Sequence, residues 1–467
     1  MVEVSSESRV AYPRRIFCNR NLRLDRIRHI GFDMDYTLAI YEEAMEHLQA
    51  DMVLERMVTN FGYPEVVLAA RYQPDFAIRG LAVDMAHGNV FKMDAHRFVG
   101  RVWHGAGPLD KEVRKRIYTN RKLSPADPSI MMVDTLFSLP EISLYCQLVA
   151  LIDELKSNSD SSPAATLTYE RLWRDLRQAM DELHRDGTLK ARILADIPRF
   201  IRRDKSLAET LHSFRSTGKR LFILTNSESH YTEAVMTHLL AGQHPAYPHW
   251  RDYFDLVIAS AKKPMFFGSG DPFFEVDENL DPMPDPALSL KRGGMYVGGN
   301  VQDLSRMFGL VGDEVLYVGD HIYGDILRSK RSTSWRTAMV VPEMERELEQ
   351  MTVHQAEVLE LEQLEETVFQ LELDRSALAL DGIRNQELNT HLKHLGQHAR
   401  DLDVKIADAF NPAWGQLFRD RAELSAFGAQ VEDYACIYTG RVSNFRFYSP
   451  SFYFRSPRAR MAHESRR

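Results

Sequence analysis

Several features that mark special classes of protein are scarce or missing in this sequence of 467 residues. It has three cysteines, Cys18, Cys146 and Cys436, and they lie far apart, so we expect neither a disulfide framework nor a cysteine metal cluster. The formal net charge is −8, which argues against the positive field of a nucleic-acid-binding protein. We therefore expect no nucleic-acid partner.

Long apolar runs are also missing. Residues 1–17 contain no apolar core of signal-peptide length, and no run approaches the roughly 18 apolar residues that a membrane helix needs. These absences predict a cytoplasmic protein without a membrane partner. The composition, 44% hydrophobic and 27% charged, is that of a globular chain with room for two or three domains.

Five apolar runs have the length and composition of buried strands. They lie at residues 29–35, 220–226, 254–260, 314–320 and 337–343. Helical patterns at 205–217, 229–240 and 324–330 alternate with them, which predicts a parallel sheet covered on both faces. Four of the runs lead into polar residues, so polar side chains should gather at the carboxyl edge of the sheet, where such sheets bind ligands.

The spacing of these runs divides the chain into three parts. The long interval between the first two strands predicts an inserted domain at 61–204, and residues 1–60 and 205–342 would form the core. Residues 343–467 are predicted as a helical region with oligomer contacts. Its apolar residues recur every three or four positions, as at Val358, Leu361, Leu364, Val368 and Leu371.

The first strand ends in paired acids, Asp33 and Asp35, in "GFDMDYT". A carboxylate at the end of a buried strand costs desolvation energy unless a cation compensates it. Carboxylate oxygens are the ligands that Mg²⁺ prefers, and Mg²⁺ often bridges to a substrate phosphate. Taken alone, the pair could also be an ordinary strand-ending turn.

Three further motifs follow later strands of the same pattern. Asp320 ends a strand and Asp325 follows it, Thr225 and Asn226 open a helix that could seat a phosphate, and Lys263 could neutralise that phosphate. Taken singly, these motifs could be a loop, a helix cap and a surface lysine. Their common place after successive strands favours one shared site.

Together the four motifs resemble those of the haloacid dehalogenase superfamily. The longer stretches "GFDMDYTLAIY", "TLFSLPE", "KKPMFFGSG" and "YVGDHIYGDILRSKR" are similar to one branch, the cytosolic purine 5′-nucleotidases that act on IMP and GMP. The resemblance runs from about residue 29 to about residue 455. It implies an α/β fold: a haloacid dehalogenase-like, Rossmannoid parallel sheet with an inserted cap domain and a helical C-terminal region.

The resemblance implies a two-step phosphoryl transfer. Asp33 would attack the phosphorus, and Asp35 would protonate the leaving oxygen and then activate water. Asp33, the Asp35 backbone carbonyl and Asp320 would hold Mg²⁺, while Asp325 would orient the metal waters or Lys263. The phosphoryl oxygens would be held by Thr225, Asn226 and Lys263.

The inserted domain should choose the substrate. Arg177, Asp181 and His184 recur at helical spacing and share one side of a helix, which by spacing alone could be a solvated face. The resemblance implies that this helix reads the purine base, with Lys190 as a further substrate contact. Phe137 would stack on the base, although a core phenylalanine is the alternative.

A second nucleotide site is also implied, for a purine nucleotide effector. Its expected residues are Arg121, Tyr323, Arg331, Gln430 and Tyr434. Asp134 stands where vertebrate members have Asn, and an acid beside a polyphosphate argues against activation by a nucleoside triphosphate.

The sequence thus predicts a Mg²⁺-dependent 5′-nucleotidase for GMP, IMP and their deoxy forms, with phosphotransferase activity on the side. The alternatives are a phosphatase for another small phosphoester and a non-catalytic assembly protein that kept the fold. The resemblance implies dimers that pair into tetramers, and the aromatic residues of "NFRFYSPSFYFR" are hard to bury within one subunit, so we expect a homodimer or homotetramer. The helices of 343–410 could instead pack back onto their own core.

Overall fold

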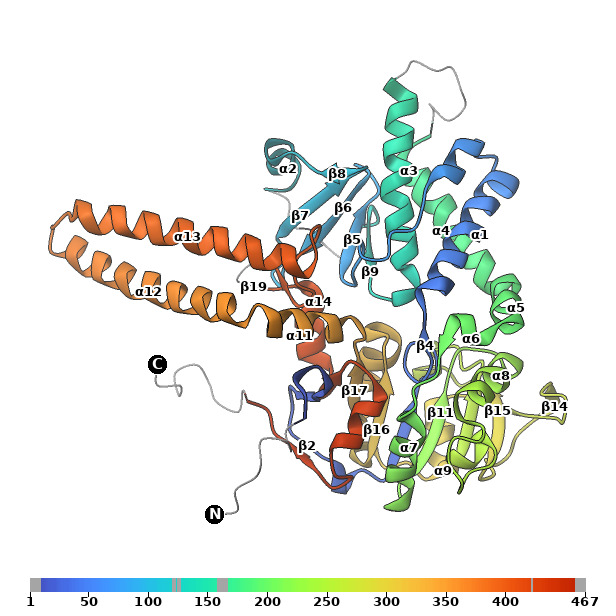
Figure 1. The fold of residues 1–467 in the computed structure, drawn as a ribbon. Coiled ribbons are helices and arrows are strands. Elements are labelled where there is room, and N and C mark those ends of the chain that lie inside the picture. The colour runs from blue at the N-terminus through green and yellow to red at the C-terminus, as the bar shows by residue number, and fades with distance from the viewer. Residues whose placement is uncertain (1–9, 120–122, 124–126, 158–166, 421–422, 458–467) are drawn as a thin grey trace, which may run out of the picture.

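A computed structural model describes residues 10–119, 123, 127–157, 167–420 and 423–457 of the chain (Figure 1). A large sheet with flanking helices forms the core. A smaller sheet with long helices beside it forms the inserted domain, and a pair of long helices projects from the rest of the molecule (Figure 1).

The core contains a ten-stranded sheet. From one edge to the other, its strands are β1 (Phe17–Cys18), β20 (Ile437–Thr439), β17 (Arg336–Val340), β16 (Val315–Gly319), β3 (His29–Phe32), β11 (Arg220–Leu224), β12 (Leu256–Ala259), β15 (Gly294–Gly298), β13 (Phe273–Val276) and β14 (Pro282–Pro286). Neighbours from β20 to β15 pair in parallel, and the outer strands pair antiparallel. The prediction of a haloacid dehalogenase-like α/β fold is confirmed, and all five predicted strands are present.

Side chains of successive residues in β11 show that both faces of the sheet are covered. Leu221 and Ile223 pack in one hydrophobic cluster with α7 (Leu207–Ser216) and α8 (Ser229–Leu240). Phe222 and Leu224 pack in another with α9 (Val301–Phe308). This alternation is the two-residue period of a strand.

Gly31, in the central strand β3, is required by its neighbours on both sides. A Cβ atom there would lie 2.3 Å from the Phe222 ring and 2.9 Å from the Tyr317 ring. These aromatic side chains from β11 and β16 close over the backbone of β3, so a larger residue would displace the strand that carries Asp33.

The inserted domain, which we call the cap, has its own antiparallel sheet. Its strands, in spatial order, are β8 (Gly107–Pro108), β7 (Val99–His104), β6 (Asn89–Met93), β5 (Leu81–Asp84) and β9 (Ile130–Val133). Its helices are α1 (Glu43–Phe61), α2 (Lys111–Tyr118), α3 (Leu139–Ser157), α4 (Tyr169–Arg185), α5 (Thr188–Ala195) and α6 (Ile197–Phe200). Residues 136–157 are long and apolar enough to be a candidate membrane span by composition, but most of that stretch is buried inside the cap.

The first boundary of the cap differs from the expected residue 61. Strand β4 (Ile40–Tyr41) pairs with β10 (Ile201–Arg202), which brings together the points where the chain leaves and re-enters the core. Helix α1 lies beyond this pair and packs on α3 and α4. We therefore place the start of the cap near residue 42, because the apolar face of α1 is buried by cap helices.

The C-terminal region begins with three helices, as predicted: α11 (Glu343–Val353), α12 (Gln355–Leu380) and α13 (Gln386–Phe410). Part of the predicted apolar stripe, Val358, Leu361 and Leu364, packs on the buried end of α13. Every described residue of α12 is at least partly exposed, which agrees with its many glutamates.

The region is not helical throughout, and this corrects the prediction. After α14 (Ala426–Tyr434), β20 returns to the core sheet beside β17, and β21 (Tyr453–Phe454) pairs with β2 (Leu22–Arg23). Phe445 and Phe454 of the aromatic stretch are buried against their own subunit. Part of the aromatic stretch is therefore buried without a partner subunit. Phe447, Phe452 and Tyr453 remain exposed.

Candidate active site

Three carboxylates meet at the carboxyl edge of the core sheet. Asp33 follows β3, Asp320 follows the neighbouring strand β16, and Asp325 lies in the short helix η10 (Ile322–Leu327). Carboxylate oxygens of the three residues all lie within 4.8 Å of one another, and all three residues are buried. The parallel pairing of the two strands brings together acids that are almost 290 positions apart in the sequence.

Lys263 crosses this group of carboxylates. Its Nζ lies 2.9 Å from Asp33 Oδ1 and 2.7 Å from Asp325 Oδ1, and it donates to the Tyr317 hydroxyl at 3.0 Å. The Asn226 side chain holds the lysine backbone from both sides, accepting from Lys263 N at 2.6 Å and donating to Lys263 O at 2.9 Å. Asn226 thus anchors the segment that carries the lysine.

Asp35 has different neighbours from Asp33. The Tyr41 hydroxyl donates to Asp35 Oδ1 and the Ser227 hydroxyl donates to Oδ2, both at 2.7 Å. A hydrogen bond of 2.9 Å joins Tyr41 to the hydroxyl of Tyr231. Thr225 is fully buried, and its hydroxyl accepts from the Ser227 backbone N–H at 3.1 Å. The two acids of the first motif are therefore held separately, one by a cation and one by hydroxyls.

Burial governs the charge states of this edge. It raises the pKa of Asp33 well above the usual range; Lys263 opposes this shift, whereas the neighbouring acids reinforce it. Burial and then Asp325 raise the pKa of Asp320 to about 8, against the effects of Arg79 and Lys263. Burial would lower the pKa of Lys263, but Asp325 and Asp33 raise it above its ordinary value. The positive charge nearby thus does not balance the negative charge of the carboxylates. Their hard oxygen atoms are suitable ligands for a divalent cation.

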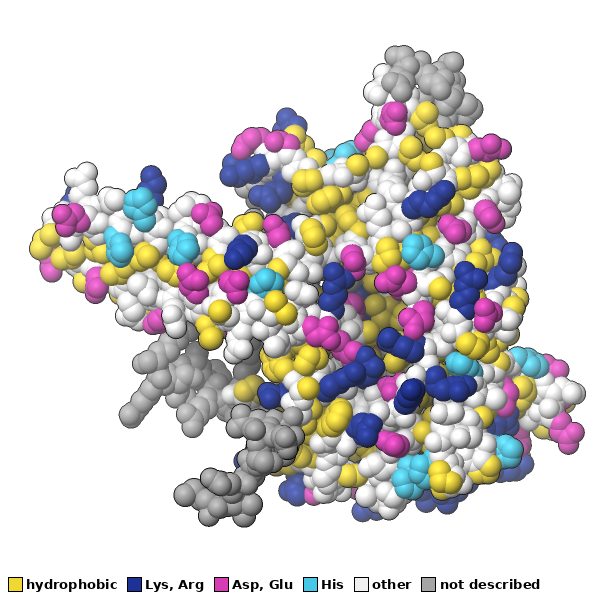
Figure 2. Space-filling model, in the orientation of Figure 1, with side chains coloured by type: hydrophobic (Ala, Val, Ile, Leu, Met, Phe, Trp, Pro, Cys, Tyr) yellow, Lys and Arg dark blue, Asp and Glu magenta, His cyan; other side chains and the backbone are white. Residues whose placement is uncertain are grey.

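The five predicted base-contacting residues line one cavity on the cap side. They are Phe137, Arg177, Asp181, His184 and Lys190, and the cavity wall also includes Asn226 and Glu228 of the core. Because Asn226 also holds Lys263, this cavity and the carboxylate cluster share a wall. A separate hollow, where the cap, the core and the C-terminal helices meet, is surrounded by charged side chains of both signs on the face shown in Figure 2.

Arg177 is held in that cavity by other cap residues. Its Nη1 lies 2.9 and 3.0 Å from the two carboxylate oxygens of Glu141 and 2.8 Å from the Ser138 hydroxyl, and its Nε lies 3.5 Å from Asp181. Glu141 is 1% exposed, and burial raises its pKa to about 7 despite Arg177. The buried Glu141 carboxylate therefore holds the arginine side chain in place from below.

Aromatic and cationic side chains complete the cavity. The Phe137 ring is partly exposed and lies edge-on to Tyr36 at 4.7 Å and to His184 at 5.4 Å. Burial, followed by Lys190 and Arg177, lowers the pKa of His184 to about 4. Lys190 pairs with Glu228, which links the cap to the core. Phe137 thus packs partly against the hydrophobic core and partly lines the cavity.

A family model described as the 5′ nucleotidase family matches residues 16–466, almost the whole chain. The chain belongs to the 5′-nucleotidase family. Together with the haloacid dehalogenase-like sheet and its carboxylate edge, this membership makes it a phosphomonoester hydrolase. The family predicted from the four motifs is confirmed.

The chain is similar to two proteins named for the same domain and, more distantly, to solved structures. A 5′-nucleotidase domain-containing protein of Dictyostelium discoideum is 29% identical over 93% of this chain and 72% of its own length. The 5′-nucleotidase domain-containing protein 2 of Homo sapiens is 29% identical over 97% of this chain and 85% of its own length. Among solved structures, a predicted phosphoglycolate phosphatase from Haemophilus somnus 129PT is 13% identical over 68% of this chain and 86% of its own, with a TM-score of 0.27.

The residues expected at an effector site of this 5′-nucleotidase fall on adjoining elements. Tyr323 lies in η10 and Arg331 in α10 (Arg328–Ser332), while Gln430 and Tyr434 lie in α14, which contacts η10. Arg121 lies outside the described residues. The structure therefore groups these four residues near the loop that carries Asp320 and Asp325.

Several site residues were not predicted. Tyr41, Glu141 and Tyr317 lie within the quoted motif stretches, and Ser227 directly follows Asn226, so their place in the sequence was a usable signal. Tyr231 lies outside these stretches and is a site residue only through its contact with Tyr41.

Proposed function

We propose that this 5′-nucleotidase depends on Mg²⁺ and hydrolyses 6-oxopurine nucleoside monophosphates, namely GMP, IMP and their deoxy forms, to nucleoside and phosphate. The observation that carries the proposal is the wall shared by the carboxylate cluster and the cap cavity. Asn226 belongs to both, so a phosphate at Asp33 would leave the base facing Arg177 and Asp181.

The reaction proceeds in two steps on the residues of the chain. A carboxylate oxygen of Asp33 attacks the phosphorus, the bond from phosphorus to O5′ breaks, and Asp35 gives its proton to O5′. Water then attacks the aspartyl phosphate, Asp35 takes the proton, and phosphate leaves as the Asp33 carboxylate is restored. Tyr41 and Ser227 hold Asp35 in place for both proton transfers.

Cations must balance the charge of the phosphoryl group during both steps. Lys263 supplies one positive charge beside Asp33, while Thr225 and Asn226 lie in the loop between β11 and α8. A bound Mg²⁺, held by Asp33, Asp320 and the Asp35 backbone carbonyl, would neutralise phosphate charge that Lys263 alone leaves unbalanced. Asp325 orients Lys263 through the 2.7 Å contact.

The cap cavity favours a 6-oxopurine. Such a base offers an acceptor at O6 and a donor at N1, whereas adenine reverses this pattern. Arg177 donates and Asp181 accepts, so the pair matches the first pattern and leaves polar groups unpaired with the second. Phe137 offers its free ring surface to the base.

The test is release of inorganic phosphate from a panel of nucleotides and simple phosphoesters, with Mg²⁺ or with EDTA. We expect GMP and IMP to give the highest kcat/KM, and EDTA to abolish turnover. A sugar phosphate hydrolysed much faster than any nucleotide would favour a phosphatase for another phosphoester. No release from any compound would favour the non-catalytic assembly protein. Adding inosine to a GMP reaction and measuring IMP tests the proposed phosphotransferase activity.

We also propose that the protein forms at least a homodimer. Helix α12 has a second, exposed apolar set, Leu359, Phe369, Leu373 and Leu380, in addition to the residues that face α13. An isolated helical pair that is apolar on two sides needs a further surface to bury. Light scattering at micromolar concentration should give at least twice the chain mass of 53.8 kDa. A clean monomer would overturn this part alone.

A further inference from the structure

Arg79 of the cap reaches the metal-binding edge of the core. The residue precedes β5, and its side chain is 0% exposed. Nη1 donates to the backbone carbonyl of Asp320 at 2.7 Å, while Nε and Nη2 donate to the two carboxylate oxygens of Glu343, each at 2.7 Å. The guanidinium group thus bridges a proposed metal ligand and the first residue of α11.

The backbone around Arg79 is fixed as tightly as its side chain. The guanidinium lies over the Phe427 ring of α14, 5.0 Å from the ring centre. Gly80 has a positive φ of 85°, and a Cβ atom there would lie 2.5 Å from Phe427 Cβ. The cap chain therefore passes so close to α14 that only glycine fits after Arg79.

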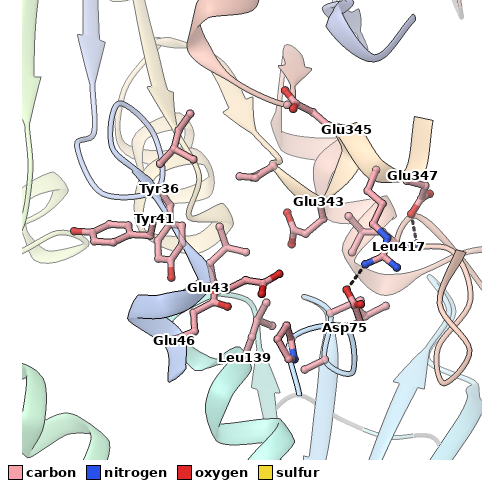
Figure 3. A pocket seen from close by; sticks show the side chains of 18 of the residues that line it. Tyr36, Tyr41, Glu43, Glu46, Asp75, Leu139, Glu343, Glu345, Glu347 and Leu417 are labelled. Atoms are coloured by element: carbon pink, nitrogen blue, oxygen red, sulfur yellow. Dashed lines mark hydrogen bonds and ion pairs between the residues drawn. The ribbon is translucent and has the colours of Figure 1, made fainter. Parts of the chain in front are cut away.

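A fully buried arginine is costly unless its charge and donors are matched. Glu343 matches the charge, and it lines the cavity where the cap, the core and the C-terminal helices meet (Figure 3). The remaining contact, from Nη1, is made to the backbone carbonyl of Asp320. Since a backbone carbonyl fixes its peptide plane, this contact restrains the direction of the Asp320 side chain.

The same helix provides a comparison. Arg441 also binds a glutamate of α11 through two nitrogens, Glu345, with Nε 2.5 Å from Oε1. It belongs to the loop after β20, and its side-chain hydrogen bonds within the described residues go to Glu345. If Arg79 only joined domains, a pair like Arg441–Glu345 would serve, and no contact with the metal loop would be needed.

We propose that Arg79 is a positioning residue for the metal site: it sets the orientation of Asp320 and makes the divalent-cation site depend on the placement of the cap. The inference rests on the proposed Mg²⁺ site. Groups that orient a metal ligand without touching the metal change metal affinity by roughly 10- to 100-fold when they are replaced.

The experiment compares Arg79→Lys with Arg441→Lys. Lysine keeps the positive charge, but it lacks the planar guanidinium group that lets Arg79 donate to Glu343 and Asp320 at the same time. Calorimetric titration of MgCl₂ into substrate-free Arg79→Lys should give a Kd raised about tenfold. Its kcat on GMP should recover at saturating Mg²⁺, with KM for GMP within about twofold of the wild type, because Arg79 is not among the residues that line the base cavity. Arg441→Lys should lower thermal stability and leave the Mg²⁺ Kd unchanged.

A Mg²⁺ Kd for Arg79→Lys equal to the wild-type value would overturn the proposal, and so would equal losses of affinity in both variants. If Arg79→Lys does not fold, Glu343→Gln serves instead. It keeps the shape of the partner and removes its charge, so it should raise the Kd in the same direction, and an unchanged Kd would again reject the idea. Since Mg²⁺ binding is measured without substrate, failure of the GMP assignment leaves this test intact.

Discussion

The carboxylate edge of the core and the base cavity of the cap are built on opposite principles. At the edge, Asp33, Asp325 and Lys263 are buried, and the lysine Nζ lies 2.9 Å from Asp33 Oδ1 and 2.7 Å from Asp325 Oδ1. In the cavity, the Arg177 and Asp181 side chains are 41% and 48% exposed and 3.5 Å apart. Charges in a dry site interact strongly and need no rearrangement during the reaction, whereas solvated charges can exchange partners when a ligand arrives. The comparison teaches that the proposed reaction site is preformed, whereas the proposed base site can still adapt to a ligand.

Removing the nucleophile should separate the two regions most sharply. Asp33→Asn keeps the size of the side chain but removes the attacking oxygen charge and a metal ligand. We expect kcat to fall by at least about 1,000-fold, or about 4 kcal/mol, on every substrate. The exposed acid Asp285 in β14 offers a matched control, and Asp285→Asn should leave kcat unchanged. Near-normal turnover in a folded Asp33→Asn protein would show that the edge is not the reaction centre.

Asp35→Asn tests the second acid of the edge. Because one group gives and then takes the proton, both steps should slow, by roughly 100- to 1,000-fold. If dephosphorylation suffers more, intact-mass measurement should detect a phosphorylated enzyme. A pH–rate profile identical in shape to that of the wild type would contradict the acid/base role.

Changing the cavity should alter selectivity without altering chemistry. Asp181→Ala removes the acceptor for the N1 donor, so the ratio of kcat/KM for GMP over AMP should shrink by about tenfold. Hydrolysis of p-nitrophenyl phosphate, which has no base, should not change. Glu170→Ala, at the exposed start of the same helix, is the control. Equal wild-type rates on GMP and AMP would remove the specificity assignment.

The smallest effect concerns stability at the base of the cavity. The folded protein keeps a proton on Glu141 up to about pH 7, whereas the unfolded chain loses it near the ordinary value of 4.5. The folded state binds more protons between these values, so stability falls as pH rises from 4.5 to 7, by up to about 1.4 kcal/mol per pH unit for this group. Glu141→Gln cannot lose a proton and should flatten this slope in denaturant unfolding measured across that range. Parallel slopes would mean that Glu141 is ionised throughout.

Some residues of each region could be predicted because a local rule places them. Asp33, Asp320 and Thr225 follow apolar strands, and parallel strands end at the same edge of a sheet. Arg177, Asp181 and His184 recur at helical spacing on α4, so they share a side of that helix. The helices of 343–410 followed from their periodicity in the same way.

The sequence by itself determined the order of strands and helices, the family and the acids at the strand ends, since these depend on periodicities and motifs that are continuous along the chain. It gave no signal for Arg79 beneath Asp320, for Tyr317 beside Lys263, or for the return of β20 to the core sheet. Only the tertiary structure decided these pairings, and with them where the cap begins. The physical reason is that a buried charge or a short strand pairs with whichever partner the packing brings within reach, however far away that partner lies in the sequence.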